Sequence, residues 1–256
     1  DAVTHKITDT FNMAGGFIGQ GALDLNGTDE VMTVDDSASF DLLTSNGAES
    51  FEGWFTTEDV AGGTHRAIVA RDSAWALRFS SDDTIKFESV LDGVWKNVTG
   101  TTALTELTAG KWYHVAATYD GSTMKLYLDG KLDNESAATG AINEVANEVR
   151  VGGNRAGNPM WWEGKLARVS VWGAALTEAE IREMMFYDWA AVSGSSIDQT
   201  DCVAWYEFSD SQAATSVSDM SGSGNTGSLS GSTPWAGPGT FTYETSTLVF
   251  DNDGGT

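Results

Sequence analysis

The alternation of apolar and polar residues between positions 112 and 131 predicts a long β-hairpin. From Tyr113 to Tyr119 every second residue is large or apolar, and side chains alternate between the two faces of a strand. Asp120-Gly121 then supplies a turn, because glycine adopts positive φ without steric cost and aspartate tolerates it. A second alternating run follows from Thr123 to Leu128. The hairpin therefore has one apolar face, which a second sheet must cover.

Similar short runs recur along the chain, and Asn-Gly or Asp-Gly turns separate several of them. Many short strands separated by such turns are typical of a β-sandwich. One helix is expected after the last long strand, because Thr177 is a good N-cap and Glu180, three residues later, completes a capping box. The expected strands outside the hairpin lie within residues 23–34, 50–56, 67–70, 75–79, 85–91, 95–98, 149–152, 166–172 and 202–208.

The hairpin also carries a family resemblance. Residues 107–121 read Leu-Thr-Ala-Gly-Lys-Trp-Tyr-His-Val-Ala-Ala-Thr-Tyr-Asp-Gly, and residues 126–131 read Leu-Tyr-Leu-Asp-Gly-Lys. Both resemble the hairpin of laminin G-like domains, which belong to the concanavalin A-like lectin and glucanase superfamily. Residues 22–27, 50–55, 164–172 and 175–181 resemble the family's other elements in the same order. The resemblance implies an all-β fold: a two-sheet antiparallel jelly-roll β-sandwich with one short helix.

The resemblance divides the chain into three parts. Residues 1–20 are expected to form an N-terminal arm, and residues 21–192 the laminin G-like jelly roll. Residues 193–256 are rich in Ser and Gly, yet Cys202 to Phe208 resembles the family's opening strand. About 60 residues are too few for a second sandwich. We therefore expect this C-terminal segment to contribute a strand to the same sandwich or to that of a neighbouring chain.

Composition limits the partners. The formal net charge is −23, which argues against nucleic acid and anionic membranes as direct partners. No run of residues approaches the roughly 18 apolar positions of a membrane-spanning helix, so no membrane insertion is expected. Cys202 is the single cysteine, which leaves no internal disulfide, and we expect it to be a small buried side chain.

Catalysis is not expected. Glycoside hydrolysis needs two carboxylates about 5–10 Å apart across one cleft. The related glucanases carry them on one strand as Glu-x-Asp-x-x-Glu, and the sequence has no such run. Adjacent acids such as Asp35-Asp36 diverge and fit turns instead. His114 lies near two tyrosines, as a lyase would require, but it matches a structural position of the family hairpin. We therefore predict that the protein is not an enzyme.

Calcium is the cofactor that the resemblance suggests, because many laminin G-like domains bind it at loops near one sheet edge. Oxygen ligands suit this ion, and the candidate ligands at the early turn are Asp24, Asn26, Asp29 and Glu30. An ordinary hydrogen-bonded Asn-Gly turn is the alternative. The family's late strand usually carries acids where this chain has Arg168, and an arginine there can neutralise an acid in place of a metal.

Aromatic residues in loops indicate where a ligand or partner binds. A tryptophan among polar neighbours can stack on a sugar ring or anchor a protein contact. The alternative is a tryptophan that folds back over the edge of the sandwich. The candidate binding residues are Trp161, Trp162, Asn154, Arg155 and Trp95, and Trp235 occupies a similar setting.

These features predict a non-catalytic binding or assembly protein. One hypothesis is a virion (phage) structural or decoration protein or a surface adhesion module. Its partners are then neighbouring protein subunits in a larger assembly, and the arm and the Ser/Gly-rich segment suit contacts between neighbours. The alternatives are a secreted carbohydrate-binding module that recognises glycans, and a polysaccharide hydrolase or lyase. The expected location is a virion, the cell surface or the extracellular space.

Overall fold

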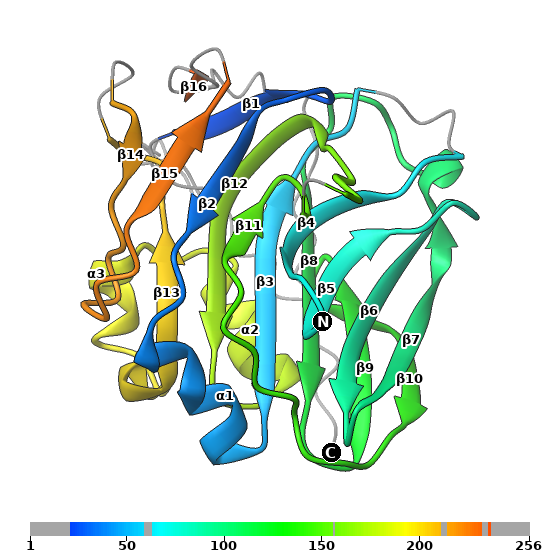
Figure 1. Cartoon of the computed structure of the whole chain (residues 1–256), viewed down its shortest axis with the longest axis vertical. Coiled ribbons are helices and arrows are strands. Elements are labelled where there is room, and N and C mark those ends of the chain that lie inside the picture. The colour runs from blue at the N-terminus through cyan, green and yellow to red at the C-terminus, as the bar shows by residue number, and fades with distance from the viewer. Residues whose placement is uncertain (1–20, 59–62, 156, 211–213, 232–234, 237–256) are drawn as a thin grey trace, which may run out of the picture.

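The computed structural model describes residues 21–58, 63–155, 157–210, 214–231 and 235–236. The expected N-terminal arm, residues 1–20, lies outside the described residues, as do residues 237–256 of the C-terminal segment. The described chain forms two antiparallel eight-stranded sheets with a few short helices (Figure 1). This arrangement confirms the jelly-roll sandwich that the sequence predicts.

The two sheets draw their strands from the whole length of the described chain. Across sheet A the order is β10 (Lys131–Ala137), β9 (Thr123–Leu128), β8 (Tyr113–Tyr119), β3 (Glu49–Phe55), β12 (Glu163–Trp172), β1 (Ala22–Asn26) and β16 (Trp235–Ala236), and β13 (Cys202–Tyr206) also pairs with β12. Across sheet B the order is β14 (Ser216–Val217), β15 (Gly227–Ser230), β2 (Val31–Val34), β11 (Val149–Val151), β4 (Arg66–Arg71), β5 (Trp75–Phe79), β6 (Thr84–Leu91) and β7 (Val94–Ala103).

The main core lies between the sheets. The apolar face of the β8–β9 hairpin points into it, as the alternation predicts, and Val115 and Leu126 are buried there. Phe51 of β3 packs against Trp75 of sheet B, with 4.3 Å between ring centroids. Full burial of one such side chain contributes about 1.5–3 kcal/mol, so the facing aromatic rows are a large share of what holds the two sheets together.

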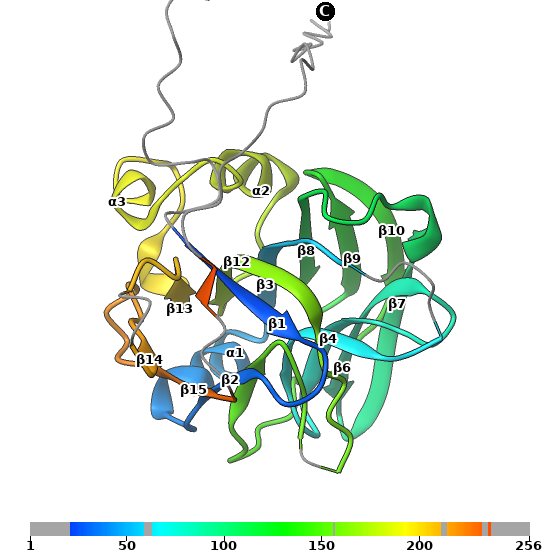
Figure 2. The same cartoon turned by 90° about the horizontal axis from the view of Figure 1, so that it is seen from above.

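Helices cover the outer face of sheet A. Figure 2 shows α2 (Glu178–Met184) and α3 (Trp189–Val192) on this side of the sandwich. Trp172 and Trp205 of the sheet pack with Ile181 of α2 in a second buried cluster. The capping box of Thr177 and Glu180 is confirmed.

The expectation of a single helix is wrong, because α1 (Asp41–Asn46) and α3 are also present. Both are too short to show a helical period in the sequence. Strand β10 was not expected either, since most of its side chains face solvent and show no alternation.

A charged network is buried between sheet A and the helices. Glu52 accepts hydrogen bonds from His114 Nε2 at 2.7 Å and Arg168 Nη2 at 2.9 Å. Burial alone would raise the pKa of Glu52, but Arg168 and His114 together hold it below its usual value. Arg168 also donates to the carbonyl oxygen of Met184, the last residue of α2, and to that of Tyr187, which follows the helix. The prediction that Arg168 neutralises an acid is confirmed.

The C-terminal segment lies within the same two sheets. Strand β13 pairs with the second half of β12, and β16 pairs with β1. In sheet B, β15 pairs with β2 and carries β14 on its other side. Cys202 is buried, as expected. Each sheet is therefore completed by strands from the end of the chain.

Candidate ligand-binding face

The outer face of sheet B is the side of the sandwich without a helical layer (Figures 1 and 2). Strand register assigns residues to this face. Phe87 of β6 pairs with Val98 of β7, and both are buried in the core between the sheets. Val90 and Trp95 pair three positions further along the two strands and therefore have the opposite orientation, so their side chains lie on the outer face.

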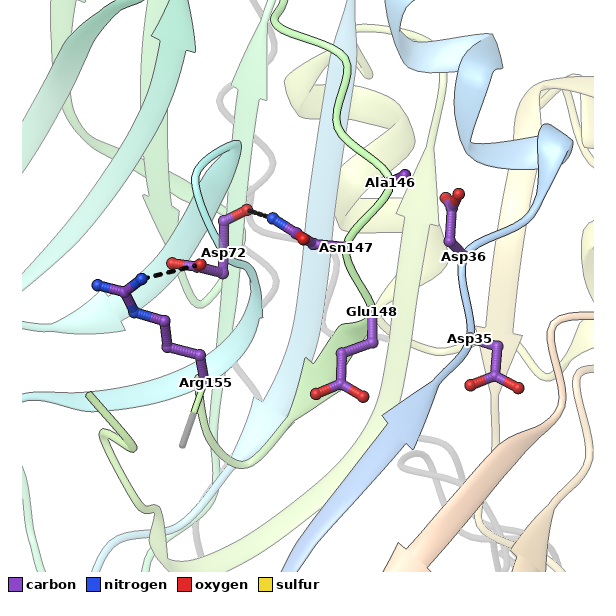
Figure 3. A pocket seen from close by; sticks show the side chains of 7 residues that line it. All are labelled: Asp35, Asp36, Asp72, Ala146, Asn147, Glu148 and Arg155. Atoms are coloured by element: carbon purple, nitrogen blue, oxygen red, sulfur yellow. Dashed lines mark hydrogen bonds and ion pairs between the residues drawn. The ribbon is translucent and has the colours of Figure 1, made fainter. Parts of the chain in front are cut away.

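A polar pocket of about 380 Å³ lies where β2, β11 and β4 meet at one end of the sheet. Val149 of β11 pairs with Val34 on one side and Arg71 on the other, so the residues that flank these three come together. Figure 3 shows the side chains that line the pocket. They are Asp35, Asp36, Asp72, Ala146, Asn147, Glu148 and Arg155.

Arg71 fixes the loop that forms one wall of this pocket. Its Nε donates to the carbonyl oxygen of Asn147 at 3.0 Å, and its Nη2 donates to Asp36 and to the carbonyl oxygen of Val145. The Asn147 side chain donates in turn to the carbonyl oxygen of Asp72 at 2.9 Å. Since these contacts involve main-chain atoms of two loops, the pocket is held in shape without a ligand.

Four carboxylates and one guanidinium group line the pocket, and two arginines outside the lining pair with two of these acids. Asp72 contacts Arg155 at 3.3 Å, and their side chains point toward each other (Figure 3). Glu148 is paired with Arg150, and Asp36 with Arg71. The pocket therefore presents oxygen acceptors beside N–H donors, with most of its charge locally balanced. Such a set of groups suits a ligand with many hydroxyls.

The predicted loop residues Asn154 and Arg155 have different roles. Arg155 lines the pocket, with an exposed side-chain fraction of 59%. Asn154 is 9% exposed, and its Oδ1 accepts a hydrogen bond from the Arg155 amide at 2.8 Å. Asn154 thus holds the main chain at Arg155 in place.

The prediction of Trp162 as a surface anchor is wrong, because its side chain is fully buried. It packs against Phe55 and Phe79 with centroid distances of 5.5 and 5.9 Å, and its Nε1 donates to the Thr56 carbonyl oxygen at 3.1 Å. The sequence indicates this burial, because Trp162 and Leu166 are separated by an even number of residues and therefore face the same side of an extended chain. Leu166 also faces the core. Trp161 is half-buried beside the loop that contains Gly153.

The two other tryptophan candidates also differ. Trp95 is 50% exposed, and its neighbour Val94 is 54% exposed, at the tip of the β6–β7 hairpin. Trp235 is half-buried against the main core, and its Nε1 donates to the carbonyl oxygen of Ala214 at 2.8 Å. Trp95 is therefore the tryptophan of the candidate set that offers the most open ring.

The four predicted calcium ligands are brought only partly together. Asn26 Nδ2 donates to Asp29 at 2.8 Å, and the Asn26 amide donates to Glu30 at 2.9 Å. Asp24 contacts Lys165 at 3.5 Å instead. Within the described ranges no three His, Cys, Asp or Glu side chains gather closely enough to hold a metal ion. Calcium at this turn stays a prediction, and the ion would have to replace these contacts.

Most of the pocket was not predicted from the sequence, which indicated a turn at Asp35-Asp36 and no role for Asp72, Asn147 or Glu148. All of these residues lie within two positions of a strand end, and the strands are visible in the sequence. What the sequence does not show is that β2, β11 and β4 are neighbours, because they are far apart along the chain.

Comparisons with known proteins agree with this architecture. The family described as the concanavalin A-like lectin/glucanases superfamily matches residues 26–182. A mouse protein, pappalysin-1, is 31% identical over 126 residues, which cover 45% of this chain and 8% of pappalysin-1. Among solved structures, a candidate carbohydrate-binding protein of Bacteroides ovatus has a TM-score of 0.60 at 16% identity, with 82% of this chain and 58% of that chain covered.

The receptor-binding domain of botulinum neurotoxin C/D mosaic serotype has a TM-score of 0.51 at 14% identity, covering 66% of this chain and 43% of that chain. The chain thus spans less than two thirds of the length of each of these proteins, and the low identities to the solved structures establish a shared fold alone. None of the described helices is long and apolar enough to cross a membrane. Since the family match extends over more than half of the sequence, the chain belongs to the concanavalin A-like lectin/glucanase superfamily, as a laminin G-like jelly roll.

Proposed function

We propose that this protein binds glycans without cleaving them, through the pocket at the end of sheet B. The observation that supports the proposal most directly is the lining of that pocket, in which carboxylates, a carboxamide and a guanidinium group surround about 380 Å³. Sugars present closely spaced hydroxyls that both donate and accept hydrogen bonds. A rigid ring of mixed donors and acceptors matches that pattern.

The relatives favour binding over catalysis. The Bacteroides ovatus protein is described as a candidate carbohydrate-binding protein, and the neurotoxin domain as a receptor-binding domain. Two features of this chain agree with a non-catalytic role. The paired carboxylates of the related glucanases are missing from its sequence, and three of the four pocket acids are engaged by arginines. Glycan binding of this kind implies an extracellular or cell-surface location.

A second candidate function is docking on neighbouring protein subunits, in a surface layer or a virion. The observation that favours it is the adjacent pair of exposed apolar side chains, Val94 and Trp95. Exposed apolar pairs at a hairpin tip are suited to insertion into a partner. Self-association that depends on Val94 and Trp95, in a protein that binds no glycan, would favour docking over glycan recognition.

A glycan array with neutral, sialylated and sulfated members tests the first function. We expect bound glycans, and we expect Asp72→Asn to weaken binding at least about tenfold, which corresponds to 1.4 kcal/mol. This substitution keeps the Asp72 carbonyl oxygen that holds Asn147. The control is Glu135→Gln on exposed β10, which removes a carboxylate far from the pocket and should leave binding unchanged.

Two results would contradict the proposal. One is an array without any bound glycan, together with equal behaviour of the two variants. The other is the release of reducing sugars from a bound polysaccharide, which would make the protein a hydrolase.

A further inference from the structure

We infer that the ligand is an uncharged oligosaccharide that extends from the pocket across sheet B to Trp95, which forms a second binding position. The inference rests on the proposed function and adds the class and the length of the glycan. It follows from the register of four neighbouring strands, from the charge along the path between the two positions, and from the exposure of Trp95.

The pocket and Trp95 lie on one face and at one end of sheet B. The pairs Ala70–Ala76, Ala76–Glu88 and Glu88–Asn97 form one row across β4, β5, β6 and β7. Two residues further toward the same end, β4 is followed by Asp72 and β7 carries Trp95. Three strand spacings separate them, which is about 14 Å. A single sugar ring cannot fill that distance, but a short linear oligosaccharide can.

The surface between the two positions is close to electrically neutral. Val90 lies directly opposite Trp95 and carries no charge. In the adjacent row, Glu88 accepts two hydrogen bonds of 2.8 Å from Arg78 of the row beyond, so each neutralises the other. Asn97, an exposed amide, follows Trp95 on the same face of β7. The path therefore suits hydroxyl groups, and the arginine beside it is already engaged by Glu88.

Charge also excludes anionic glycans. The chain carries a net charge of −23. Arginines pair with three of the four pocket carboxylates, which leaves one negative charge in excess at the pocket. A sialylated or sulfated glycan would meet like charge both at a distance and at the rim, which lowers association rate and affinity. A neutral sugar meets the same carboxylates as hydrogen-bond acceptors.

Trp95 has the properties of a stacking platform. Half of its surface is exposed although Val90 beside it is buried. An indole ring gains from contact with the apolar face of a sugar, and the adjacent Asn97 carboxamide can bind that sugar's hydroxyls. Loss of one such aromatic contact typically changes affinity by about tenfold.

Isothermal titration with linear oligomers of glucose, mannose, galactose and xylose, from one to six units, tests the inference. We expect affinity for at least one series to rise with length and then to level off. Trp95→Ala should weaken the affinity for the long oligomers about tenfold and leave the affinity for the shortest ones unchanged. Trp95→Phe should retain most of the wild-type affinity for the long oligomers. Asp72→Asn should weaken all lengths. The matched control is Val94→Ala, an equally exposed neighbour on the opposite face of β7.

The outcomes separate the two proposals. If monosaccharides bind as tightly as hexamers, the extended site does not exist and the pocket alone binds the sugar. The same conclusion follows if Trp95→Ala shows the same increase of affinity with oligomer length as the wild type. Binding of sialylated or sulfated glycans with no neutral oligomer bound would overturn the ligand class. If no glycan of any kind binds, the proposed function fails as well.

Discussion

Glu49 of β3 is a carboxyl group buried between the two sheets. Its side chain is fully enclosed, and in the described part of the chain neither carboxyl oxygen has a hydrogen-bond partner. Burial raises the pKa of Glu49 to about 8, and the nearby Ser89 hydroxyl opposes this only weakly. Since an ion in this position would lack compensation, the fold keeps the carboxyl group protonated at neutral pH.

This burial predicts a stability that falls as pH rises. The folded-state pKa, about 8, lies above the ordinary value of 4.5. The contribution of Glu49 is therefore complete below pH 4.5 and lost as pH rises through 8, at about 1.4 kcal/mol per pH unit in between. Urea unfolding from pH 5 to 8.5 should show this slope, and Glu49→Gln should flatten it. Exposed Glu106→Gln is the control, and an unchanged slope in Glu49→Gln would refute the assignment.

The neighbouring tryptophans of the 153–162 loop should differ in stability effect. Trp162→Ala removes a ring enclosed by Phe55 and Phe79, and large-to-small changes of this kind cost about 3–5 kcal/mol. Trp161→Ala, at a half-buried position, should cost much less. Denaturant titration of the two variants measures the difference directly. Equal losses would mean that Trp162 does not carry the packing described for it.

At the scale of elements, Arg168 connects strand β12 to helix α2. It links the buried Glu52 to the main chain that follows the helix. Arg168→Met should destabilise the fold by about 3–5 kcal/mol, because Glu52 is then left as a buried charge with His114 as its remaining close ionisable partner. The double variant Arg168→Met with Glu52→Gln should be more stable than the single one. A double-mutant cycle with additive effects would show that the two groups do not interact.

The early turn gives the test for calcium. Asn26 Oδ1 already accepts hydrogen bonds from the Thr28 and Asp29 amides. Any ion must compete with these bonds, so we expect binding only in the range of weak extracellular sites, about 10⁻⁴–10⁻³ M. Millimolar calcium should then raise Tm slightly through mass action, and Asp29→Ala should remove the rise. If Tm is the same in calcium and in chelator, the turn is a hydrogen-bonded Asn-Gly turn without a metal.

Local signals in the sequence predicted elements better than they predicted the site. The β8–β9 hairpin, the capped helix α2 and the role of Arg168 depend on residues close in sequence or on a family position. The pocket depends on β2, β4 and β11 being neighbours in sheet B, and this order follows from long-range packing. Trp162 was misassigned for a different reason: the glycine and proline residues around it suggest a loop, whereas its spacing from Leu166 indicates the core-facing side.

At the scale of the whole molecule, the helix-covered face of sheet A and the open face of sheet B have different roles. Sheet A carries α2, α3 and the buried ion pairs on its outer side, which leaves sheet B as the surface that can receive an extended ligand. The acidic, rigid end of sheet B combines the pocket and Trp95 in one cross-strand row. Stability and recognition thus depend on different faces, so substitutions at the pocket should affect binding with little effect on unfolding.

The C-terminal segment provides the last prediction, because it belongs to both sheets. Without residues 193–256 the edges of β12, β1 and β2 would be unpaired, and the fully buried Trp205 and the buried Tyr206 would be lost from their clusters. Open strand edges together with uncovered apolar surface favour aggregation or a molten state. We expect the chain that ends at residue 192 to be insoluble, or to lack near-UV circular dichroism and bind a hydrophobic dye. The matched control ends after residue 236, retains β13 to β16, and should unfold cooperatively. If the shorter chain also unfolds cooperatively, residues 21–192 fold without the strands that complete both sheets, and the prediction is wrong.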